Sequence, residues 1–323
     1  MVIIVSGGAG FIGSNFIEYI FHTIPDCKVV CLDKMTYAGN PNSIAAFSTN
    51  SMFQFEKGDI CSKETVFSLL DRVRPDYVVH FAAESHVDRS ITNPSAFLQT
   101  NIIGTSVLMD ACLKYDVKRF HLVSTDEVYG DLPLDDSTIG FTEESPLKPN
   151  SPYSCSKAAA DMLAMAYRRT YGLDVTISRC TNNYGPYQHL EKLIPKMINN
   201  ALKGLPLPIY GDGLNVRDWI HVYDHCEAIF KILFQGQAGA IYNISSENLF
   251  CNIDVIYEIC SLTNASRDLI SFVDDRKGHD LKYALDSSKI RKELGWVPKV
   301  PFNEGLKSTI QWYENHPNWW AKA

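Results

Sequence analysis

The first apolar run of the chain, Val2–Val5, is continuous rather than alternating, as expected for a strand buried on both faces. Similar runs recur, and the segments between them carry apolar residues at helical spacing. The pattern predicts strands at 28–32, 53–57, 76–81, 119–124 and 174–179, and helices at about 11–22, 62–72, 94–115 and 152–171. This alternation predicts an α/β fold, a Rossmann-like doubly wound parallel sheet with helices on both faces.

A glycine-rich turn, Gly7–Gly13, joins the first predicted strand to the first predicted helix. Its glycines at 7, 10 and 13 permit a tight turn, close approach of a ligand and close helix packing, and the helix N-terminus offers N–H groups to a phosphate. The second strand ends at Asp33, where a carboxylate typically holds ribose hydroxyls. Asp33 could instead cap the strand end, but strand, glycines, helix and acid in register favour a dinucleotide site.

The regular alternation ends after Arg179, where the turn-rich passage Asn182–Pro186 begins, and a helical pattern returns at 223–235. We therefore expect residues 1–179 to form a dinucleotide-binding Rossmann domain, to which residues 219–245 return. Residues 180–218 and 246–323 are expected to form a smaller, mixed α/β C-terminal lobe that binds substrate.

Composition narrows the classes of protein. The chain of 323 residues is 46% apolar, so it can bury a large core, and its net charge of −7 without a basic block does not indicate a nucleic-acid or anionic membrane partner. No apolar run approaches the ~18 residues of a membrane span, and no signal peptide is visible. The nine cysteines form no CxxC pair and no metal-like spacing. We expect buried thiols in a reducing cytoplasm and no metal site.

Ligands of open parallel sheets bind beyond the carboxyl ends of the strands, so each strand end is informative. Asp59 follows the third strand, where it could reach an adenine amine or cap the helix that begins near Ser62. Small residues after the fourth strand let a cofactor pass close to the backbone. His86 follows them and could be catalytic, although a lone histidine in a polar turn is more often structural.

The fifth strand ends in the most informative stretch, Ser124–Gly130, which contains the adjacent carboxylates Asp126 and Glu127. Adjacent acids are usually solvated, but at a strand end inside a cleft they can divide acid and base roles. Downstream, Tyr153 and Lys157 open a predicted helix on one face. The ammonium should favour tyrosinate and lower the tyrosine pKa. About one such pair is expected by chance, so its placement after the fifth strand makes it credible.

Two arginines in the second half of the chain, Arg217 and Arg276, could clamp a diphosphate together. They could equally be ordinary surface ion pairs. Just before Arg217 in the chain, the sequence of Pro206–Gly211 predicts an extended, stiff segment suited to lining a flat ring.

These motifs together resemble the extended short-chain dehydrogenase/reductase superfamily, and most closely its nucleotide-sugar 4,6-dehydratases, the dTDP-glucose 4,6-dehydratases in particular. The resemblance covers nearly the whole chain. The stretches that carry it are Gly7–Gly13, Thr36–Asn40, Ala82–Ser90, Ser124–Gly130, Tyr153–Lys157, Asn182–Pro186, Glu191–Pro195, Pro206–Gly211, Arg217–Trp219 and Asp275–His279.

The resemblance implies three sets of site residues. The catalytic set is Thr125, Asp126, Glu127, Tyr153 and Lys157. The NAD set is Gly7, Gly10, Phe11, Ile12, Gly13, Asp33, Lys34, Met35, Thr36, Asp59, Ile60, Phe81, Ala82, Ala83, Glu84, Ser85, Thr100, Tyr153, Lys157 and Asn183. The sugar-nucleotide set is Ser85, Thr125, Asn182, Lys192, Leu193, Pro208, Ile209, Tyr210, Arg217, Asn252, Asp275, Arg276 and His279.

The resemblance also implies a mechanism, the conversion of dTDP-glucose to dTDP-4-keto-6-deoxyglucose and water. Tyr153, supported by Lys157, takes the proton of the sugar 4-hydroxyl, which Thr125 positions, while hydride passes from C4 to NAD. Glu127 then removes the C5 proton, and a protonated Asp126 donates to the C6 hydroxyl, which leaves as water. Hydride returns to C6, and NAD is regenerated.

Rival functions differ in what they need from these residues. A nucleotide-sugar 4-epimerase shares the glycine turn and the Tyr153–Lys157 pair but does not need Asp126–Glu127, so the acids favour a dehydratase. A dehydratase of another, UDP-linked sugar would use the same acids. A non-enzymatic NAD-binding protein of the same fold would usually have lost part of the set. Asp33 favours NAD over NADP, an argument that Lys34 weakens slightly, and the resemblance implies a homodimer.

Overall fold

In the computed structural model of the chain, residues 1–134, 140–275, 278–317 and 319 are described. Among these residues, the larger sheet has seven parallel strands in the order β10-β6-β5-β4-β1-β2-β3. Its strands are β1 (Val2–Ser6), β2 (Lys28–Asp33), β3 (Phe53–Lys57), β4 (Tyr77–His80), β5 (Arg119–Thr125), β6 (Val175–Cys180) and β10 (Ile241–Ile244). The predicted doubly wound parallel sheet is therefore confirmed.

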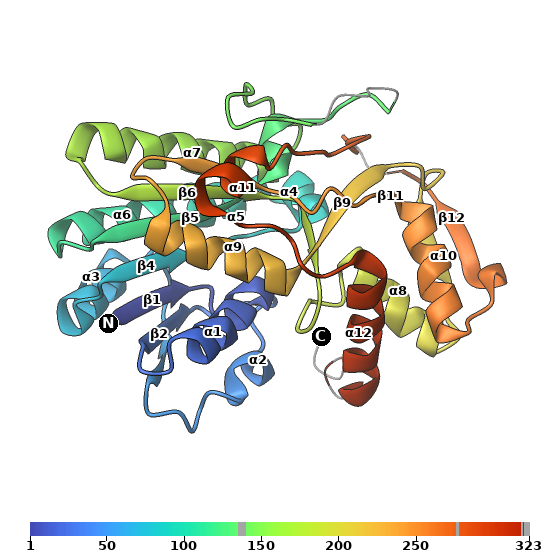
Figure 1. Cartoon of the computed structure of the whole chain (residues 1–323), viewed down its shortest axis with the longest axis horizontal. Helices are drawn as coiled ribbons and strands as arrows, with labels where there is room; N and C mark the ends of the chain where they lie inside the picture. Colours follow the sequence, from blue (N-terminus) through green and yellow to red (C-terminus); the bar gives the residue numbers. More distant parts are fainter. Residues whose placement is uncertain (135–139, 276–277, 318, 320–323) are drawn as a thin grey trace.

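Helices cover both faces of this sheet (Figure 1). The helices of this part of the chain are α1 (Phe11–Thr23), α2 (Pro41–Ala45), α3 (Lys63–Val73), α4 (Val87–Thr92), α5 (Pro94–Phe97), α6 (Thr105–Lys114), α7 (Pro152–Tyr171), α9 (Val222–Gln235) and α11 (Ser288–Leu294). Helices α3, α6 and α7 pack on one face and α1 and α9 on the other. The predicted helices at 11–22, 62–72, 152–171 and 223–235 agree with α1, α3, α7 and α9 to within one residue, whereas α2, α4 and α11 were not predicted.

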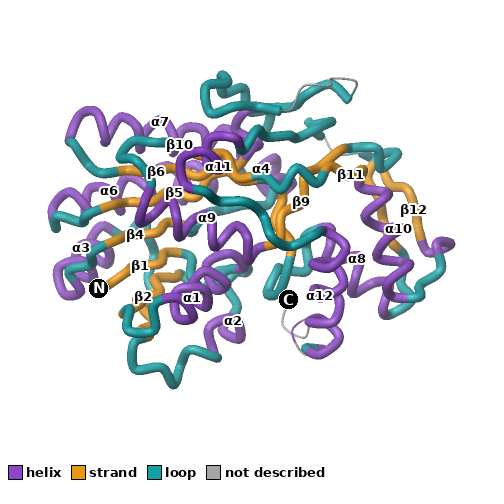
Figure 2. The backbone as a smooth tube through the Cα atoms, in the orientation of Figure 1, coloured by secondary structure: helices purple, strands orange, loops and turns teal. Residues whose placement is uncertain are grey.

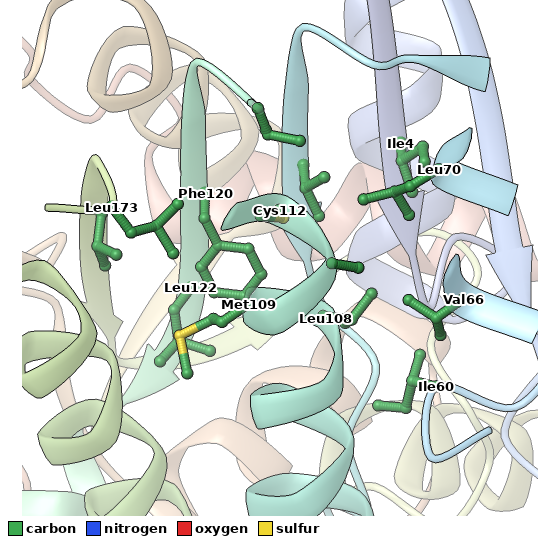
Figure 3. Close-up of a cluster of buried hydrophobic side chains, with 14 of the residues drawn as sticks. Ile4, Ile60, Val66, Leu70, Leu108, Met109, Cys112, Phe120, Leu122 and Leu173 are labelled. Atoms are coloured by element: carbon green, nitrogen blue, oxygen red, sulfur yellow. The ribbon is translucent and has the colours of Figure 1, made fainter. Parts of the chain in front are cut away.

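The apolar core on the α3–α6–α7 face explains why continuous apolar runs form the strands. Phe120 and Leu122 of β5 point at Met109 and Cys112 of α6, and all four side chains are fully buried (Figure 3). Burial of each large apolar side chain contributes roughly 1.5–3 kcal/mol. This packing holds β5 rigidly, so the backbone at its carboxyl end has a fixed position.

The segment at 94–115 differs from its prediction, because it is not one regular helix. Between α5 and α6 the backbone widens into a π-helix, η1 (Leu98–Gly104). Apolar spacing cannot distinguish this register from an α-helix. The run Pro94–Lys114 is also the one stretch of the described residues long and apolar enough to cross a membrane, by length and composition alone. Half of it is buried inside the fold, as in a core helix.

The rest of the chain forms a smaller lobe beside the carboxyl ends of the large sheet (Figure 2). Its strands are β7 (Asn182–Tyr184), β9 (Val216–His221) and β11 (Leu249–Cys251) in one sheet, and β8 (Leu207–Tyr210) and β12 (Ile270–Val273) in another. Its helices are α8 (Leu193–Leu202), α10 (Asn252–Thr263), α12 (Phe302–Asn315) and the short η3 (Arg267–Leu269). A separate apolar core holds them together, while α9 and β10 lie on the large sheet.

Candidate active site

A cavity of about 320 Å³ opens at the carboxyl ends of β1, β2, β4, β5 and β6, the edge where open parallel sheets bind ligands. It brings together all five residues of the predicted catalytic set and the predicted NAD set except Met35. From the predicted sugar-nucleotide set, the cavity is lined by Ser85, Thr125, Asn182 and Lys192. The cavity therefore extends from the glycine turn to the end of β5.

The glycine turn at one end of the cavity fits a diphosphate. Gly7 has φ +74°, and a Cβ there would lie 2.5 Å from the Ala82 backbone nitrogen, so only glycine fits this close approach. A Cβ on Gly10 would meet only the Gly7 carbonyl oxygen, at 3.2 Å, which leaves its other side open. Gly10 precedes α1 without any side-chain cap. The first N–H groups of α1 are therefore left for an anion.

The position of Asp33 is compatible with both of the roles considered for it. Its carboxylate accepts hydrogen bonds from the backbone N–H groups of Ala9 (3.0 Å) and Met35 (2.8 Å), so it does fix the strand end. It also lines the cavity, and each carboxylate oxygen retains a lone pair for a ribose hydroxyl. Burial raises the pKa of Asp33, and the two N–H donors oppose that rise. Met35 itself does not line the cavity and serves Asp33 through its backbone.

Two further alternatives are resolved by local contacts. Ser62, not Asp59, is the N-cap of α3, because its side chain accepts from the Thr65 N–H. Asp59 instead pairs with Lys34 at 2.7 Å and lines the cavity, so Lys34 is engaged beside Asp33. His86 caps α4 and lies 3.6 Å from Glu191, which is the structural role expected for a lone histidine in a polar turn.

The end of β5 places three side chains in the cavity through a short 3₁₀ turn, η2 (Asp126–Tyr129). Thr125 caps this turn: its hydroxyl accepts from the Glu127 N–H (3.3 Å) and donates to Asp126 Oδ1 (3.1 Å). Asp126 is 3% exposed, and among the described residues its Oδ2 atom has no hydrogen-bond partner. Burial, with the charge of Glu127 as the second cause, raises the pKa of Asp126 well above its usual range. This carboxyl group is built to hold a proton.

Tyr153 and Lys157 lie in the first turns of α7, which Ser151 starts with a capping box. Lys157 Nζ donates to the Val123 carbonyl of β5 at 2.7 Å, so the lysine anchors the helix to the strand that carries the acids. Both side chains are buried. The geometry thus brings the tyrosine, the lysine and the Thr125–Glu127 turn to one place, as the sequence predicts.

The expected lowering of the Tyr153 pKa by Lys157 is wrong for the protein alone. Burial raises the pKa of Tyr153 well above its usual value, and the Glu127 charge adds to the rise; a hydrogen bond with Thr125 opposes it. Burial also lowers the pKa of Lys157. Desolvation outweighs the attraction that the i, i+4 spacing suggested. A phenolate at this site therefore needs further positive charge in the cavity.

The remaining predicted sugar-nucleotide residues lie outside this cavity. Lys192 Nζ, which does line it, donates to the Ser85 carbonyl at 2.9 Å and so links the two lobes. The others belong to the smaller lobe: Leu193, Pro208, Ile209, Tyr210, Arg217, Asn252, Asp275 and His279, with Arg276 outside the described residues. Ile209 is 2% exposed within that lobe's core, so its side chain offers little to a ligand.

Arg217 is not a surface ion pair. Its guanidinium is buried, donates to the carbonyls of Val216, Leu281 and Asp280, and lies over the Tyr283 ring at 4.3 Å. Its positive charge reaches Asp126, where it opposes the rise in pKa. A buried cation held by neutral carbonyls keeps its charge available to an anion.

Several cavity residues belong to none of the predicted sets, namely Leu32, Ala38, Gly39, Gly58, Val123, Ser124, Cys180, Thr181, Gln188, His189 and Glu191. The strand-end rule could have found Cys180 and Thr181, because they end and follow β6. Glu191 opens the Glu191–Pro195 stretch that carries the family resemblance, whereas Gln188 and His189 lie in no motif or periodic pattern that would have identified them as cavity lining.

A glycine turn on a Rossmann sheet, with a tyrosine–lysine pair in the same cavity, defines an enzyme of the short-chain dehydrogenase/reductase class. The family model described as GDP-mannose 4,6 dehydratase matches residues 4–309, and the chain belongs to this family of nucleotide-sugar dehydratases. The dTDP-glucose 4,6-dehydratase of Neisseria meningitidis serogroup B is 47% identical, over 99% of this chain and 95% of that protein. The dTDP-glucose 4,6-dehydratase 1 of Escherichia coli K12 is also 47% identical, over 99% and 94%.

Solved structures agree with this placement. DesIV, a dTDP-glucose 4,6-dehydratase from Streptomyces venezuelae crystallised with NAD bound, superposes with a TM-score of 0.95, 47% identity and 99% coverage of both chains. A UDP-glucose 4-epimerase from Thermotoga maritima superposes with a TM-score of 0.91 and 30% identity, covering 98% of this chain and 100% of the epimerase. The fold is therefore shared by both chemistries, and the site must separate them.

Proposed function

We propose that the protein is a dTDP-glucose 4,6-dehydratase with NAD as its resident cofactor, forming dTDP-4-keto-6-deoxyglucose and water. The observation that carries this proposal is the Thr125-Asp126-Glu127 turn in one cavity with Tyr153 and Lys157. The curated relatives and DesIV, at about 47% identity over nearly the whole chain, support the same activity.

The cofactor fits the cavity on the grounds already given: the glycine turn, the free N-terminus of α1 and the carboxylate of Asp33. When bound, NAD accepts a hydride from the sugar and later returns it, so that the reaction has no net redox change. Lys157 and Asn183 would hold its nicotinamide end, and Gly7–Gly13 its diphosphate. Asn183 is pre-oriented, because His225 Nδ1 lies 2.8 Å from its Oδ1 and its amide donates to the Thr181 carbonyl.

The chain's own residues move three protons. Tyr153 accepts the proton of the sugar 4-hydroxyl, which Thr125 positions. Glu127 removes the C5 proton, which is acidic once C4 is a ketone, and later returns one to C5. Asp126, kept protonated by its burial, donates to the C6 hydroxyl so that it leaves as water. Consecutive acids with different environments thus take opposite roles.

The sugar nucleotide would extend from this centre into the smaller lobe. Asn182 and Lys192 line the same cavity as the acids, and Arg217 supplies a buried positive charge. Asn252 carries a buried Oδ1 atom without a partner among the described residues, as expected for an amide that awaits a ligand donor. Tyr210 and His279 lie near one another, with ring centroids 6.2 Å apart, and the Tyr210 hydroxyl lies 3.5 Å from Asp88 of α4.

A product assay tests the activity. Purified protein is incubated with dTDP-glucose, and the alkaline absorbance of a 4-keto product is followed. A 4-epimerase, the second function compatible with the fold, gives no such product, and neither does a protein that only binds NAD. Turnover of UDP-glucose at a rate equal to that of dTDP-glucose would contradict the thymidine assignment, since one methyl group is worth about 1–3 kcal/mol in a fitted pocket.

The assembly we propose is a homodimer in the cytoplasm. Leu98 and Ile103 of η1 and Met162 of α7 are 47%, 47% and 65% exposed, an apolar surface on the helices through which the family resemblance implies dimerisation. The described cysteines are all free thiols, which suits a reducing compartment. Sedimentation that shows only monomer at micromolar concentration would refute the dimer.

A further inference from the structure

One turn beyond Lys157, helix α7 carries a second buried charge that the mechanism does not use. Asp161 is 1% exposed, and its Oδ2 atom accepts from Arg179 Nε of β6 at 2.9 Å. Its other oxygen, Oδ1, is buried and makes no well-formed hydrogen bond among the described residues. Native proteins seldom leave such an atom without a well-formed hydrogen bond, so the contact with Arg179 does not by itself account for this buried carboxylate.

Arg179 is fixed from its far side. Its NH1 group donates to the Tyr129 hydroxyl at 2.7 Å, and that hydroxyl donates to Asn243 of β10 at 2.8 Å. The guanidinium also lies over the Tyr129 ring. Because a buried ion pair often stabilises a fold no better than apolar residues would, stability alone does not account for Asp161 and Arg179. The network does hold the Asp161 carboxylate in one position.

Four titratable groups surround Lys157. Tyr153 and Asp161 lie on the same helix at i−4 and i+4, Cys180 comes from β6, and His80 comes from β4. Burial raises the pKa of Cys180 to about 12 and lowers the pKa of His80 to about 3, so both are neutral near pH 7. Burial lowers the pKa of Lys157, and the negative charge of Asp161 opposes that effect.

Burial also raises the pKa of Asp161, but Arg179, the Ser124 hydroxyl and Lys157 act against that rise. The ion pair with Arg179 favours the ionised carboxylate. Asp161 is therefore the anion of this group of side chains, and it lies one helical turn from the lysine that anchors the base.

We propose that Asp161, held by Arg179, is a positioning residue that keeps the ammonium of Lys157 charged beside Tyr153. The proposal rests on the proposed function, because it assigns Asp161 a part in preparing the base. Without that negative charge, the buried ammonium would lose its proton at a lower pH, and the phenolate would lose its cationic neighbour.

The test uses Asp161→Asn, which keeps the shape and still offers Arg179 an acceptor. Initial oxidation of dTDP-glucose is followed in single turnover across pH, by the absorbance of the reduced cofactor. We expect the alkaline limb of the profile to move to lower pH by about one unit, since an opposite charge at close range shifts a titration by that order. The matched control is Asp110→Asn, which removes a carboxylate bonded to Tyr167 of the same helix but away from the cavity.

A second readout does not depend on activity. Trace acetylation of the whole protein with acetic anhydride, measured across pH by mass spectrometry, reports the titration of Lys157 directly. We expect Lys157 of Asp161→Asn to become reactive at lower pH than in the wild type and in Asp110→Asn. If Asp161→Asn folds poorly, Asp161→Asn/Arg179→Gln removes both buried charges and should displace the Lys157 profile in the same direction by a smaller amount, because loss of the Arg179 cation favours the charged lysine.

An unchanged Lys157 acetylation profile in the folded variants would overturn the proposal, even if activity fell. Failure of the proposed function looks different: the wild type would produce no 4-keto sugar, while the displacement of Lys157 reactivity in Asp161→Asn would still be present.

Discussion

Replacing Asp126 by asparagine is the sharpest test of the acid assignment. Asparagine has the same shape, and its oxygen can still accept from the Thr125 hydroxyl as Asp126 Oδ1 does at 3.1 Å. What it lacks is the acidic proton. General acid catalysis typically contributes about 10²- to 10⁴-fold, so we expect water elimination to slow by that factor. Oxidation at C4, which uses Tyr153, should remain within a few-fold of the wild-type rate.

The same substitution should stabilise the fold at neutral pH. In the folded protein, burial raises the pKa of Asp126 well above that of an unfolded aspartate, about 3.9. The folded state thus binds this proton more tightly than the unfolded state does. The proton's contribution to the free energy of unfolding is complete below about pH 3.9 and is lost as pH rises through the folded pKa. The loss is about 1.4 kcal/mol per unit of pKa difference. The asparagine side chain does not titrate. The stability of Asp126→Asn relative to the wild type should therefore increase as pH rises from the unfolded to the folded pKa of Asp126.

Two measurements check these expectations. In single turnover with dTDP-glucose, Asp126→Asn should accumulate reduced cofactor while the 4-keto-6-deoxy product appears slowly. Urea unfolding at pH 4 and pH 8 should show a stability difference in favour of the variant that grows with pH. Dehydration at the parental rate would show that Asp126 is not the acid, and a difference that shrinks with pH would show that its carboxyl group is not held protonated.

Further predictions follow from neighbouring residues. Tyr153→Phe should abolish the first oxidation, so unchanged formation of reduced cofactor in single turnover would refute its role as base. Arg89 lies 3.5 Å over the Tyr37 ring and 3.4 Å from Glu191, joining the loops on either side of the cavity. Arg89→Ala should therefore release NAD several-fold faster during dialysis, with kcat nearly unchanged at saturating NAD. Equal NAD retention in wild type and variant would show that this contact does not close the site.

The sequence predicted the parts of this site that depend on strand ends. Continuous apolar runs located β1, β2 and β5, and the rule that ligands bind at their carboxyl ends placed Asp33 and Asp126 in one cavity. The sequence did not predict which side chains of the smaller lobe face the nucleotide part of the substrate. Pro206–Gly211 was expected to line a ring, yet Ile209 packs into the lobe's own core. Which face of a short edge strand meets the ligand depends on the packing of α8 and α10, which local pattern does not encode.

The pKa of Tyr153 was the other property of the site that residue spacing predicted wrongly. The i, i+4 relation of Tyr153 and Lys157 suggested that attraction would lower the tyrosine pKa, but spacing carries no information on burial. In the folded chain both side chains are desolvated, and desolvation acts against the charged form of each. The charges in the sequence therefore give the sign of the interaction between two side chains. They do not give the cost of desolvation, which is larger here and acts in the opposite direction.

The same reasoning explains how two consecutive acids acquire different roles. Asp126 and Glu127 are equivalent in sequence, and either could have been named the acid. The 3₁₀ turn after β5 buries the Asp126 side chain and leaves Glu127 only partly buried. Each charge makes the other harder to ionise, so the more buried carboxyl keeps its proton and the other is left as the base. An epimerase, which expels no water, has no need of this division, so the proposed acid role of Asp126 is what would distinguish a dehydratase from an epimerase of the same fold.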